Sequence, residues 1–234
     1  MEKLVYLLIG PPGTVDPAVA ATLRDSTVPR LFELGAASVQ LNVTDPSLGH
    51  PFGVAPEEDS DQILAAVFAW VDAAEGSRLA TALPDPATSG ASWHGWLVSE
   101  AEPIPNRAHP PGPDGQVAGF AQIVALRRPA GLSWAEWRRI WQGHHTSVAI
   151  NTQSTFRYVQ NVVFRPVTPN APTYAAVVEE CFPVEATTDL HVFFDAVGDD
   201  ARLSRHMAAM SESCDRFMDG AAPVSWTKEW VFTR

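Results

Sequence analysis

The sequence is short of positive charge and of long apolar runs. Its 234 residues contain 16 Lys and Arg against 27 Asp and Glu, which gives a formal net charge of −11. An acidic chain repels phosphate backbones, and no basic block interrupts it, so we expect no nucleic-acid partner and no membrane partner. The longest apolar stretches, at 4–9 and 63–71, are far shorter than the roughly 20 residues that cross a bilayer.

Cysteine and recognisable cofactor motifs are also scarce. The two cysteines, Cys181 and Cys214, have neither CxxC spacing nor a Cys/His cluster, which predicts reduced thiols and no metal site. No dinucleotide fingerprint, complete phosphate loop or nucleophile elbow occurs. Met1 to Lys3 leads directly into a strand-like segment, without the basic region and cleavage site of a secretory signal. We therefore expect a cytoplasmic protein.

The sequence does contain an internal repeat of strand and helix patterns. In each half an aliphatic strand pattern runs through a Pro/Gly turn into a helix start. Asp16 before Pro17 predicts one cap, and Ser133 with Glu136 has the spacing of a capping box. Strands are expected at 3–9, 37–43, 64–70 and 93–99, and again at 120–126, 156–164, 174–180 and 226–233. The order β-α-β-β-α-β therefore occurs twice.

That order is typical of a ferredoxin-like unit, whose four-stranded sheet has helices on one face and needs a cover for the other. We expect an α+β protein in which two such units form an intramolecular pseudo-dimeric α+β barrel. The expected parts are a degenerate N-terminal unit at 1–102, a Pro-rich linker at 103–115 and a C-terminal unit at 116–234. The stretch 46–60 predicts a long loop or flap, and 187–197 an additional helix.

The segment from Trp134 to Val148 concentrates side chains that can do chemistry. Its aromatic and aliphatic residues recur at helical spacing, and at about 100° per residue His144 falls near the centre of the apolar stripe and His145 near its edge. An imidazole among aromatic rings can pass a proton in either direction near neutral pH. The alternative is an ordinary helix histidine bonded to a carbonyl, and the periodicity leaves both histidines open.

The next strand offers hydrogen-bonding groups on both faces. Tyr158 and Gln160 share one face, whereas Arg157 and Asn161 share the other. Either pair could bind a phenol or enolate oxygen, or could be ordinary polar positions of a sheet. The sequence does not say which face lines a pocket.

Two adjacent carboxylates, Glu179 and Glu180, lie in the strand that follows. Because side chains alternate along a strand, only one of them can point toward a given site. A carboxylate there could partner His145 or act as a base, and the alternative is a charge on an edge strand.

These residues together resemble a known family. Gly131-Leu132-Ser133 before Trp137, Trp141 followed by His145, and the run Phe156 to Asn161 are similar to the EthD-like family of the dimeric α+β barrel superfamily. Glu180-Cys181-Phe182 and Asp215-Arg216-Phe217 fit the same pattern, so the likeness covers roughly 120–234. Its members are small acid–base enzymes or accessory proteins, among them decarboxylases, cyclases and isomerases of aromatic and polyketide-like compounds. The resemblance implies that His145 occupies the family's histidine position.

The resemblance implies a cofactor-independent enzyme of the lyase or isomerase type, with a hydrophobic aromatic or polyketide-like carbonyl compound as substrate. Decarboxylation, dehydration, cyclisation and isomerisation all fit, with His145 as the proton shuttle. The catalytic candidates are His145, His144 and Tyr158, and the substrate-binding candidates are Trp137, Trp141, Gln160, Asn161 and Glu180.

Other functions and partners stay open at this point. One alternative is a haem-binding or oxygenase-type barrel, because related barrels bind haem through a helix histidine. Another is a non-catalytic protein for small-molecule binding or assembly. The first-half counterpart of the histidine segment, 23–29, has no histidine, so we expect one site per chain, in the C-terminal half. Whether the first half adds a lid or pocket wall, and whether the chain forms a homodimer, is left open.

Overall fold

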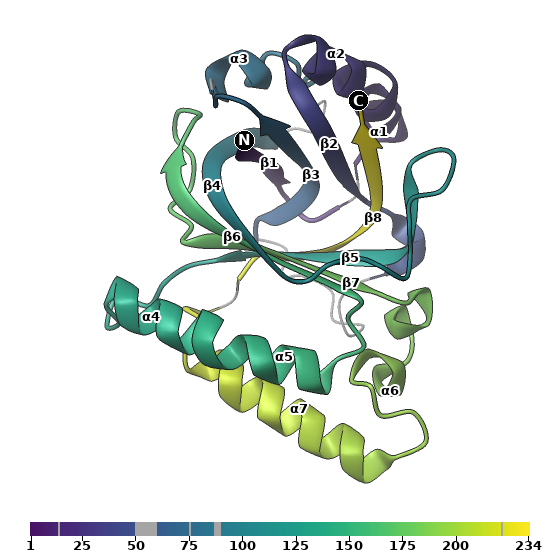
Figure 1. Ribbon diagram of the computed structural model, residues 1–234, viewed down its shortest axis with the longest axis vertical. Helices are drawn as coiled ribbons and strands as arrows, with labels where there is room; N and C mark the ends of the chain where they lie inside the picture. Colours follow the sequence, from purple (N-terminus) through teal and green to yellow (C-terminus); the bar gives the residue numbers. More distant parts are fainter. Residues whose placement is uncertain (14, 50–59, 75, 87–89, 221) are drawn as a thin grey trace.

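Strands from both halves of the chain close into one antiparallel barrel (Figure 1). The computed structural model describes residues 1–13, 15–49, 60–74, 76–86, 90–220 and 222–234. The barrel strands are β1 (Glu2–Gly10), β2 (Ala36–Thr44), β3 (Gln62–Val71), β4 (Ser92–Ile104), β5 (Gln116–Leu126), β6 (Arg157–Pro166), β7 (Ala176–Phe182) and β8 (Val224–Thr233). Their order around the barrel is β1-β3-β2-β8-β5-β7-β6-β4, and each neighbouring pair is antiparallel. The α+β class expected from the sequence is confirmed.

The two halves use the same strand order. In the first half it is β4-β1-β3-β2, and in the second half it is β8-β5-β7-β6. The barrel closes where β2 pairs with β8 and where β4 pairs with β6. Because β4 extends to Ile104, its last residues lie in the stretch expected to be linker.

Helices cover the barrel on two opposite sides (Figure 1). The N-terminal half contributes α1 (Pro17–Thr22), the π-helix η1 (Leu23–Thr27), α2 (Val28–Glu33), the 3₁₀ turn η2 (Pro46–Leu48) and α3 (Gly76–Ala80). The C-terminal half contributes α4 (Trp134–Ile140), the π-helix η4 (Trp141–His145), α5 (Thr146–Thr152), the 3₁₀ turn η5 (Val184–Thr187), α6 (Leu190–Phe193) and α7 (Asp200–Asp215). None of the helices in the described ranges is long and apolar enough to cross a membrane.

The predicted helix starts are confirmed in atomic detail. Asp16 Oδ1 accepts a hydrogen bond from the backbone N–H of Ala18, at 2.7 Å. Ser133 and Glu136 form the reciprocal bonds of a capping box. These caps satisfy backbone donors that the first helical turn leaves unpaired.

Two predicted loop and helix segments have different outcomes. The expected helix at 187–197 is shorter, because α6 spans only Leu190–Phe193 and Asp195 has a left-handed backbone conformation with φ 46°. Within the expected loop at 46–60, Pro46–Leu48 form a 3₁₀ turn, and residues 50–59 lie outside the described part of the chain.

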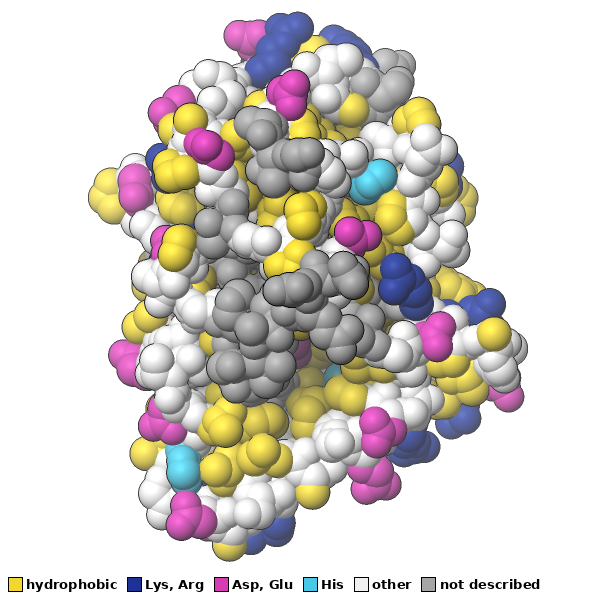
Figure 2. Space-filling view, turned by 180° about the vertical axis from the view of Figure 1, so that it is seen from behind, with side chains coloured by type: hydrophobic (Ala, Val, Ile, Leu, Met, Phe, Trp, Pro, Cys, Tyr) yellow, Lys and Arg dark blue, Asp and Glu magenta, His cyan; other side chains and the backbone are white. Residues whose placement is uncertain are grey.

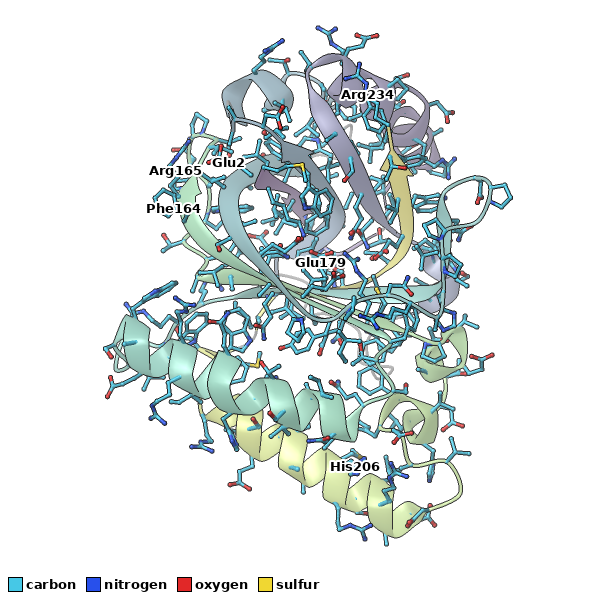
Figure 3. All side chains as sticks on the ribbon, viewed as in Figure 1. Glu2, Phe164, Arg165, Glu179, His206 and Arg234 are labelled. Atoms are coloured by element: carbon cyan, nitrogen blue, oxygen red, sulfur yellow. The ribbon has the colours of Figure 1, made fainter. Side chains whose placement is uncertain are left out.

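Charged side chains are buried inside the barrel. Lys3 Nζ lies 2.9 Å from Glu179 Oε1 and 2.5 Å from Glu100 Oε2. Arg157 Nη1 lies 3.3 Å from Glu229 Oε2 and 3.6 Å from Glu179 Oε2. Burial alone would raise the pKa of Glu179, but the two cations outweigh it and hold that pKa below its usual range. Figure 3 shows Glu179 on the side of the sheet away from α4, α5 and α7.

Candidate functional site

The histidine segment changes its helical geometry at the histidines. After α4, residues Trp141–His145 form a π-helical turn before α5 begins. This turn is wider than an α-helical one, so it shifts the phase of the residues that follow. His145 is buried at 8% exposure, whereas His144 is exposed. The α-helical periodicity placed His144 nearest the centre of the buried face, and this placement is wrong. His145, the residue implied by the family resemblance, is the one that faces inward.

His145 is held by contacts with α7 and the chain just after it. Its Nδ1 lies 2.9 Å from the hydroxyl oxygen of Ser213, and its ring centroid lies 4.5 Å from that of Phe217. Burial, followed by the neighbouring His144, lowers the pKa of His145 to about 4. The imidazole is therefore neutral near pH 7. Among the described residues nothing bonds to its Nε2.

A cavity of about 240 Å³ lies between the helical layer and the outer face of the C-terminal strands. Its walls are mostly apolar and aromatic, with a small number of polar groups, as is usual for small-molecule sites. The lining residues are Gln122, Val124, Leu126, Trp141, His145, Gln153, Tyr158, Val178, Glu180, Phe193, Phe194, Met210, Cys214, Phe217, Met218, Ala222 and Val224. Figure 2 shows hydrophobic side chains gathered in the lower part of that view, where the C-terminal helices lie.

Three polar side chains form a row across the floor of the cavity. Gln122 on β5 is in register with Glu180 on β7, and Glu180 is in register with Tyr158 on β6. Because directly paired residues point to the same face of a sheet, the three lie side by side beneath the histidine helix. The row therefore places an amide, a carboxyl and a phenol together at one level of the cavity.

Glu180 is the most unusual member of this row. Its side chain is buried, and among the described residues it forms neither a hydrogen bond nor an ion pair. Burial raises its pKa to about 7. A carboxyl of this kind is close to half deprotonated at neutral pH, which suits a group that accepts and returns protons.

Tyr158 is positioned by a chain of polar side chains. Its hydroxyl oxygen accepts a hydrogen bond from Gln160 Nε2 at 3.1 Å, and that amide also donates to Thr146 Oγ1 at 2.7 Å. Burial, followed by the nearby charge of Glu180, raises the pKa of Tyr158. The phenol therefore stays protonated and can donate its hydrogen.

The structure brings together four of the residues expected at the site. His145, Trp141, Tyr158 and Glu180 all line the cavity, whereas His144, Trp137, Gln160 and Asn161 do not.

The residues outside the cavity have other contacts. The indole N–H of Trp137 donates to the carbonyl of Phe217 at 2.9 Å, and Gln160 supports Tyr158. Asn161 lies on the barrel side of β6, where its Nδ2 donates to Glu179 Oε1 at 2.6 Å. Asn161 was expected to bind a substrate beside His145. It lies on the opposite face of β6 from the cavity, so this expectation is wrong.

Three further residues at the site were not anticipated. Gln122 and Gln153 line the cavity, and Ser213 bonds to His145. Gln122 did carry a signal, because it is the one polar residue of the apolar run 120–126. Ser213 carried none, since its partner is 68 residues away in the sequence.

The first half has the same helical irregularity without the polar groups. Its π-helical turn Leu23–Thr27 places buried Thr27 at the position that His145 has in η4. On the barrel strands beneath, Leu4, Ala69 and Val39 form an apolar cross-strand row. The described residues therefore provide one polar cavity row, in the C-terminal half.

Haem, one of the alternatives above, does not fit this cavity. A volume of about 240 Å³ suits a ligand smaller than the drug-sized compounds that fill pockets of roughly 300–1,000 Å³, and a porphyrin is larger than these compounds. The described lining residues include no Lys or Arg to pair with propionate groups. No cluster of three or more His, Cys, Asp or Glu in the described ranges is arranged to hold a metal ion.

The sequence matches the family model of the EthD domain over residues 129–221. Residues 129–221 are therefore similar to an EthD domain. The matched region spans the histidine helix, β6, β7 and α7, so the cavity is built mainly from the EthD domain. The resemblance stated from the sequence is confirmed. No curated protein matches the chain significantly.

Three solved structures are similar to this chain over nearly its whole length. An anthrone oxidase-like protein has a TM-score of 0.57 at 10% identity, with 100% of this chain and 94% of that chain covered. At this identity the likeness shows the fold alone. A provisionally assigned monooxygenase from Lactobacillus acidophilus NCFM has a TM-score of 0.48 at 6% identity, covering 100% and 97% of the two chains. A dye-decolorizing peroxidase from Bacteroides thetaiotaomicron has a TM-score of 0.46 at 9% identity, covering 97% and 92%.

Proposed function

We propose that this EthD protein is a cofactor-independent enzyme that removes a proton from carbon in an aromatic or polyketide-like ketone, with Glu180 as the base. The observation that carries the proposal is the state of Glu180. Its carboxyl is buried in the cavity, has no partner among the described residues and has a pKa raised by burial to about 7. A base with this pKa matches proton transfer at neutral pH.

The neighbouring groups fit the charge that such a reaction develops. Removing the proton moves negative charge onto the carbonyl oxygen of the substrate, and the protonated Tyr158 can donate a hydrogen bond to that oxygen. His145 is neutral, so its Nε2 can orient the substrate without adding charge. A conjugate acid with a pKa of about 4 makes His145 a weak base. We therefore propose Glu180, in place of His145, as the group that takes up the proton.

The fate of the enolate decides the reaction class. Isomerisation, dehydration, decarboxylation and cyclisation can all proceed through it. A solved neighbour described as anthrone oxidase-like favours a different outcome, reaction with molecular oxygen. In that case the CH₂ carbon loses two hydrogens, one oxygen atom becomes a new carbonyl, and the other leaves as water. We propose this oxygenase-type outcome ahead of the lyase and isomerase outcomes.

Anthrone under anaerobic conditions in D₂O is the first test, because exchange of its CH₂ protons reports proton abstraction alone. We expect the wild-type protein to catalyse the exchange and the isosteric variant Glu180→Gln to lose it by about a hundredfold or more. Nuclear magnetic resonance measures the exchange. Admitting oxygen and following its consumption then tests the second step.

A matched control is Glu185→Gln, which alters an exposed glutamate in η5. It should exchange at the wild-type rate. If Glu180→Gln keeps the exchange while His145→Gln loses it, His145 is the base and the assignment of Glu180 is wrong. If neither substitution alters exchange but the protein binds anthrone, the non-catalytic alternative replaces the proposal.

The identical strand order of the two halves also supports two fused ferredoxin-like units, at 1–102 and 116–234, as the origin of the barrel. In this interpretation the N-terminal unit is the degenerate copy, since its apolar row and Thr27 replace the polar row and the histidine. Its role would be to complete the barrel behind the catalytic sheet.

A further inference from the structure

The hydroxyl group of Ser213 has a single hydrogen-bond partner among the described residues. Ser213 lies in α7, which packs against η4 and α5, and it is 2% exposed. Its Oγ lies 2.9 Å from His145 Nδ1. Ser204, in the same helix, donates its hydroxyl hydrogen to the backbone carbonyl four residues earlier, at 2.9 Å, whereas Ser213 forms no such bond within the described chain. The imidazole is therefore the one acceptor that these residues offer to the Ser213 hydrogen.

This restriction decides which ring nitrogen of His145 carries a hydrogen. Burial, followed by His144, lowers the pKa of His145 to about 4, so the ring is neutral at pH 7 and has one N–H. With the hydrogen on Nδ1, the ring would donate to Ser213, and the hydroxyl hydrogen would be buried without an acceptor. With the hydrogen on Nε2, the hydroxyl donates to Nδ1. The second arrangement is favoured, because a buried donor without an acceptor costs free energy.

The orientation of the imidazole ring follows from the same contact. A ring turned by 180° about its Cβ–Cγ bond would place a carbon atom against the Ser213 hydroxyl, which would again lose its acceptor. In the observed orientation Nε2 points away from Ser213. It forms no hydrogen bond among the described residues and is not one of their fully buried polar atoms. Because His145 lines the cavity, the Nε2 hydrogen is available to a molecule bound there.

We infer that Ser213 is a positioning residue that holds neutral His145 with its hydrogen on Nε2, so that the imidazole donates a hydrogen bond to an acceptor oxygen of the substrate. This role rests on the proposed function for the class of substrate, an aromatic or polyketide-like ketone. It also divides the tasks within the cavity. A nitrogen that already carries a hydrogen cannot accept the substrate proton, so His145 binds the oxygen while Glu180 takes up the proton.

Nuclear magnetic resonance of the ligand-free protein tests the position of the hydrogen directly. In protein labelled with nitrogen-15 histidine, long-range proton–nitrogen spectra at pH 7 separate protonated from unprotonated ring nitrogens. The signals of His145 are identified as those that are lost in His145→Gln. We expect a protonated Nε2 and an unprotonated Nδ1, and a protonated Nδ1 would overturn the inference.

Substituting Ser213 tests its part in this arrangement. Ser213→Ala removes the hydroxyl, and the variant should fold, because alanine is at least as favourable as serine in a helix. Without a donor to Nδ1 the other tautomer becomes populated, and the two nitrogen signals of His145 should move toward each other. The matched control is Ser211→Ala, which alters an exposed serine of the same helix and should leave both signals in place. Unchanged signals in Ser213→Ala would show that Ser213 does not select the tautomer.

Ligand binding shows whether the Nε2 hydrogen is used. Anthrone has an acceptor oxygen, and dihydroanthracene has the same three-ring frame without it. Affinity for each compound is measured anaerobically by quenching of tryptophan fluorescence. We expect Ser213→Ala to weaken anthrone binding by about threefold to fivefold, which is at most the value of one net hydrogen bond, and to leave dihydroanthracene binding unchanged. Equal losses for the two compounds, or a loss for neither, would reject Nε2 as a donor to the substrate.

The outcomes also separate this inference from the proposed function. The expected tautomer and binding losses, in a protein that exchanges no anthrone protons, keep the role of Ser213 and reject catalysis. Proton exchange that depends on Glu180, in a protein whose His145 is protonated on Nδ1, keeps Glu180 as the base and rejects the role of Ser213. An unprotonated Nε2, together with exchange that needs His145 but not Glu180, rejects both.

Discussion

Two titratable side chains in one cavity have pKa values shifted in opposite directions. Burial disfavours the charged form of each, so it raises the pKa of Glu180 from 4.5 to about 7 and lowers that of His145 from 6.5 to about 4. The folded state therefore binds the Glu180 proton more tightly than the unfolded state does, and the His145 proton less tightly. Between about pH 4.5 and 6.5, Glu180 makes the protein less stable as the pH rises, and His145 makes it more stable.

These opposing contributions largely cancel in the wild-type protein, and Glu180→Gln removes one of them. The rise in the pKa of Glu180 from 4.5 to about 7 corresponds to about 3 kcal/mol. The variant should match the wild type below pH 4.5, gain stability relative to it as the pH rises to 7, and stay about 3 kcal/mol more stable above that. Urea unfolding at several pH values measures the difference. A difference that is constant over pH 4.5–7 would show that the carboxyl of Glu180 is not desolvated.

The sequence could not decide which side chains of these strands enter the cavity. Because side chains alternate along a strand, Glu179 and Glu180 point to opposite faces of the sheet, and so do Tyr158 and Asn161. Alternation shows which face is buried only when the other face is polar. Here both faces are buried, one in the barrel and one under the helices, so both sets contain polar and apolar residues. The choice depends on barrel closure, which no local pattern encodes.

A π-helical turn is the element that orients the histidine. The turns at Leu23–Thr27 and Trp141–His145 occupy corresponding places in the two halves, and each ends on a buried residue. Helix starts, the order of strands and helices along the chain, and the repeat were all predictable from local patterns. The extra width of the turn was not, because periodicity analysis assumes about 100° per residue throughout. That assumption selected His144, one residue before the inward position.

Inserting an alanine after Gly143, an exposed residue in the middle of this turn, should rotate His145 by about 100° relative to α4. His145 then leaves its inward position, and its contact with Ser213 is lost. We expect a folded protein whose affinity for anthrone falls by about tenfold or more, since the cavity wall is rearranged. The matched control is an alanine inserted after Asp25, at the corresponding place in the N-terminal π-turn. It should cost stability in the first half and leave binding at the wild-type level, and equal effects of the two insertions would contradict a role for the C-terminal turn in the site.

The whole molecule is held together across its two halves by the barrel interior. Its buried ions come from distant parts of the sequence, and Arg157 of β6 contacts Gln40 of β2, Glu102 of β4 and Glu229 of β8. A prediction from local patterns gives the eight strands, but neither the pairing of β2 with β8 and β4 with β6 nor this network. The network lies on the opposite face of β7 from Glu180, so stability and chemistry use different faces of the same strand.

Substituting Arg157 tests that division. Arg157→Met leaves Glu179 and Glu229 without a shared cation in a buried site, and breaking one partner of a buried ion pair costs about 3–5 kcal/mol. We expect a loss of this size in urea unfolding, and about half of it should return when Glu229→Gln is added, because the second change removes one of the stranded carboxylates. Anthrone binding and proton exchange, measured well below the Tm, should stay within a few-fold of wild type. If the variant instead keeps its stability and loses exchange, Arg157 acts on the cavity through the sheet, and the two faces of the barrel wall are coupled rather than independent.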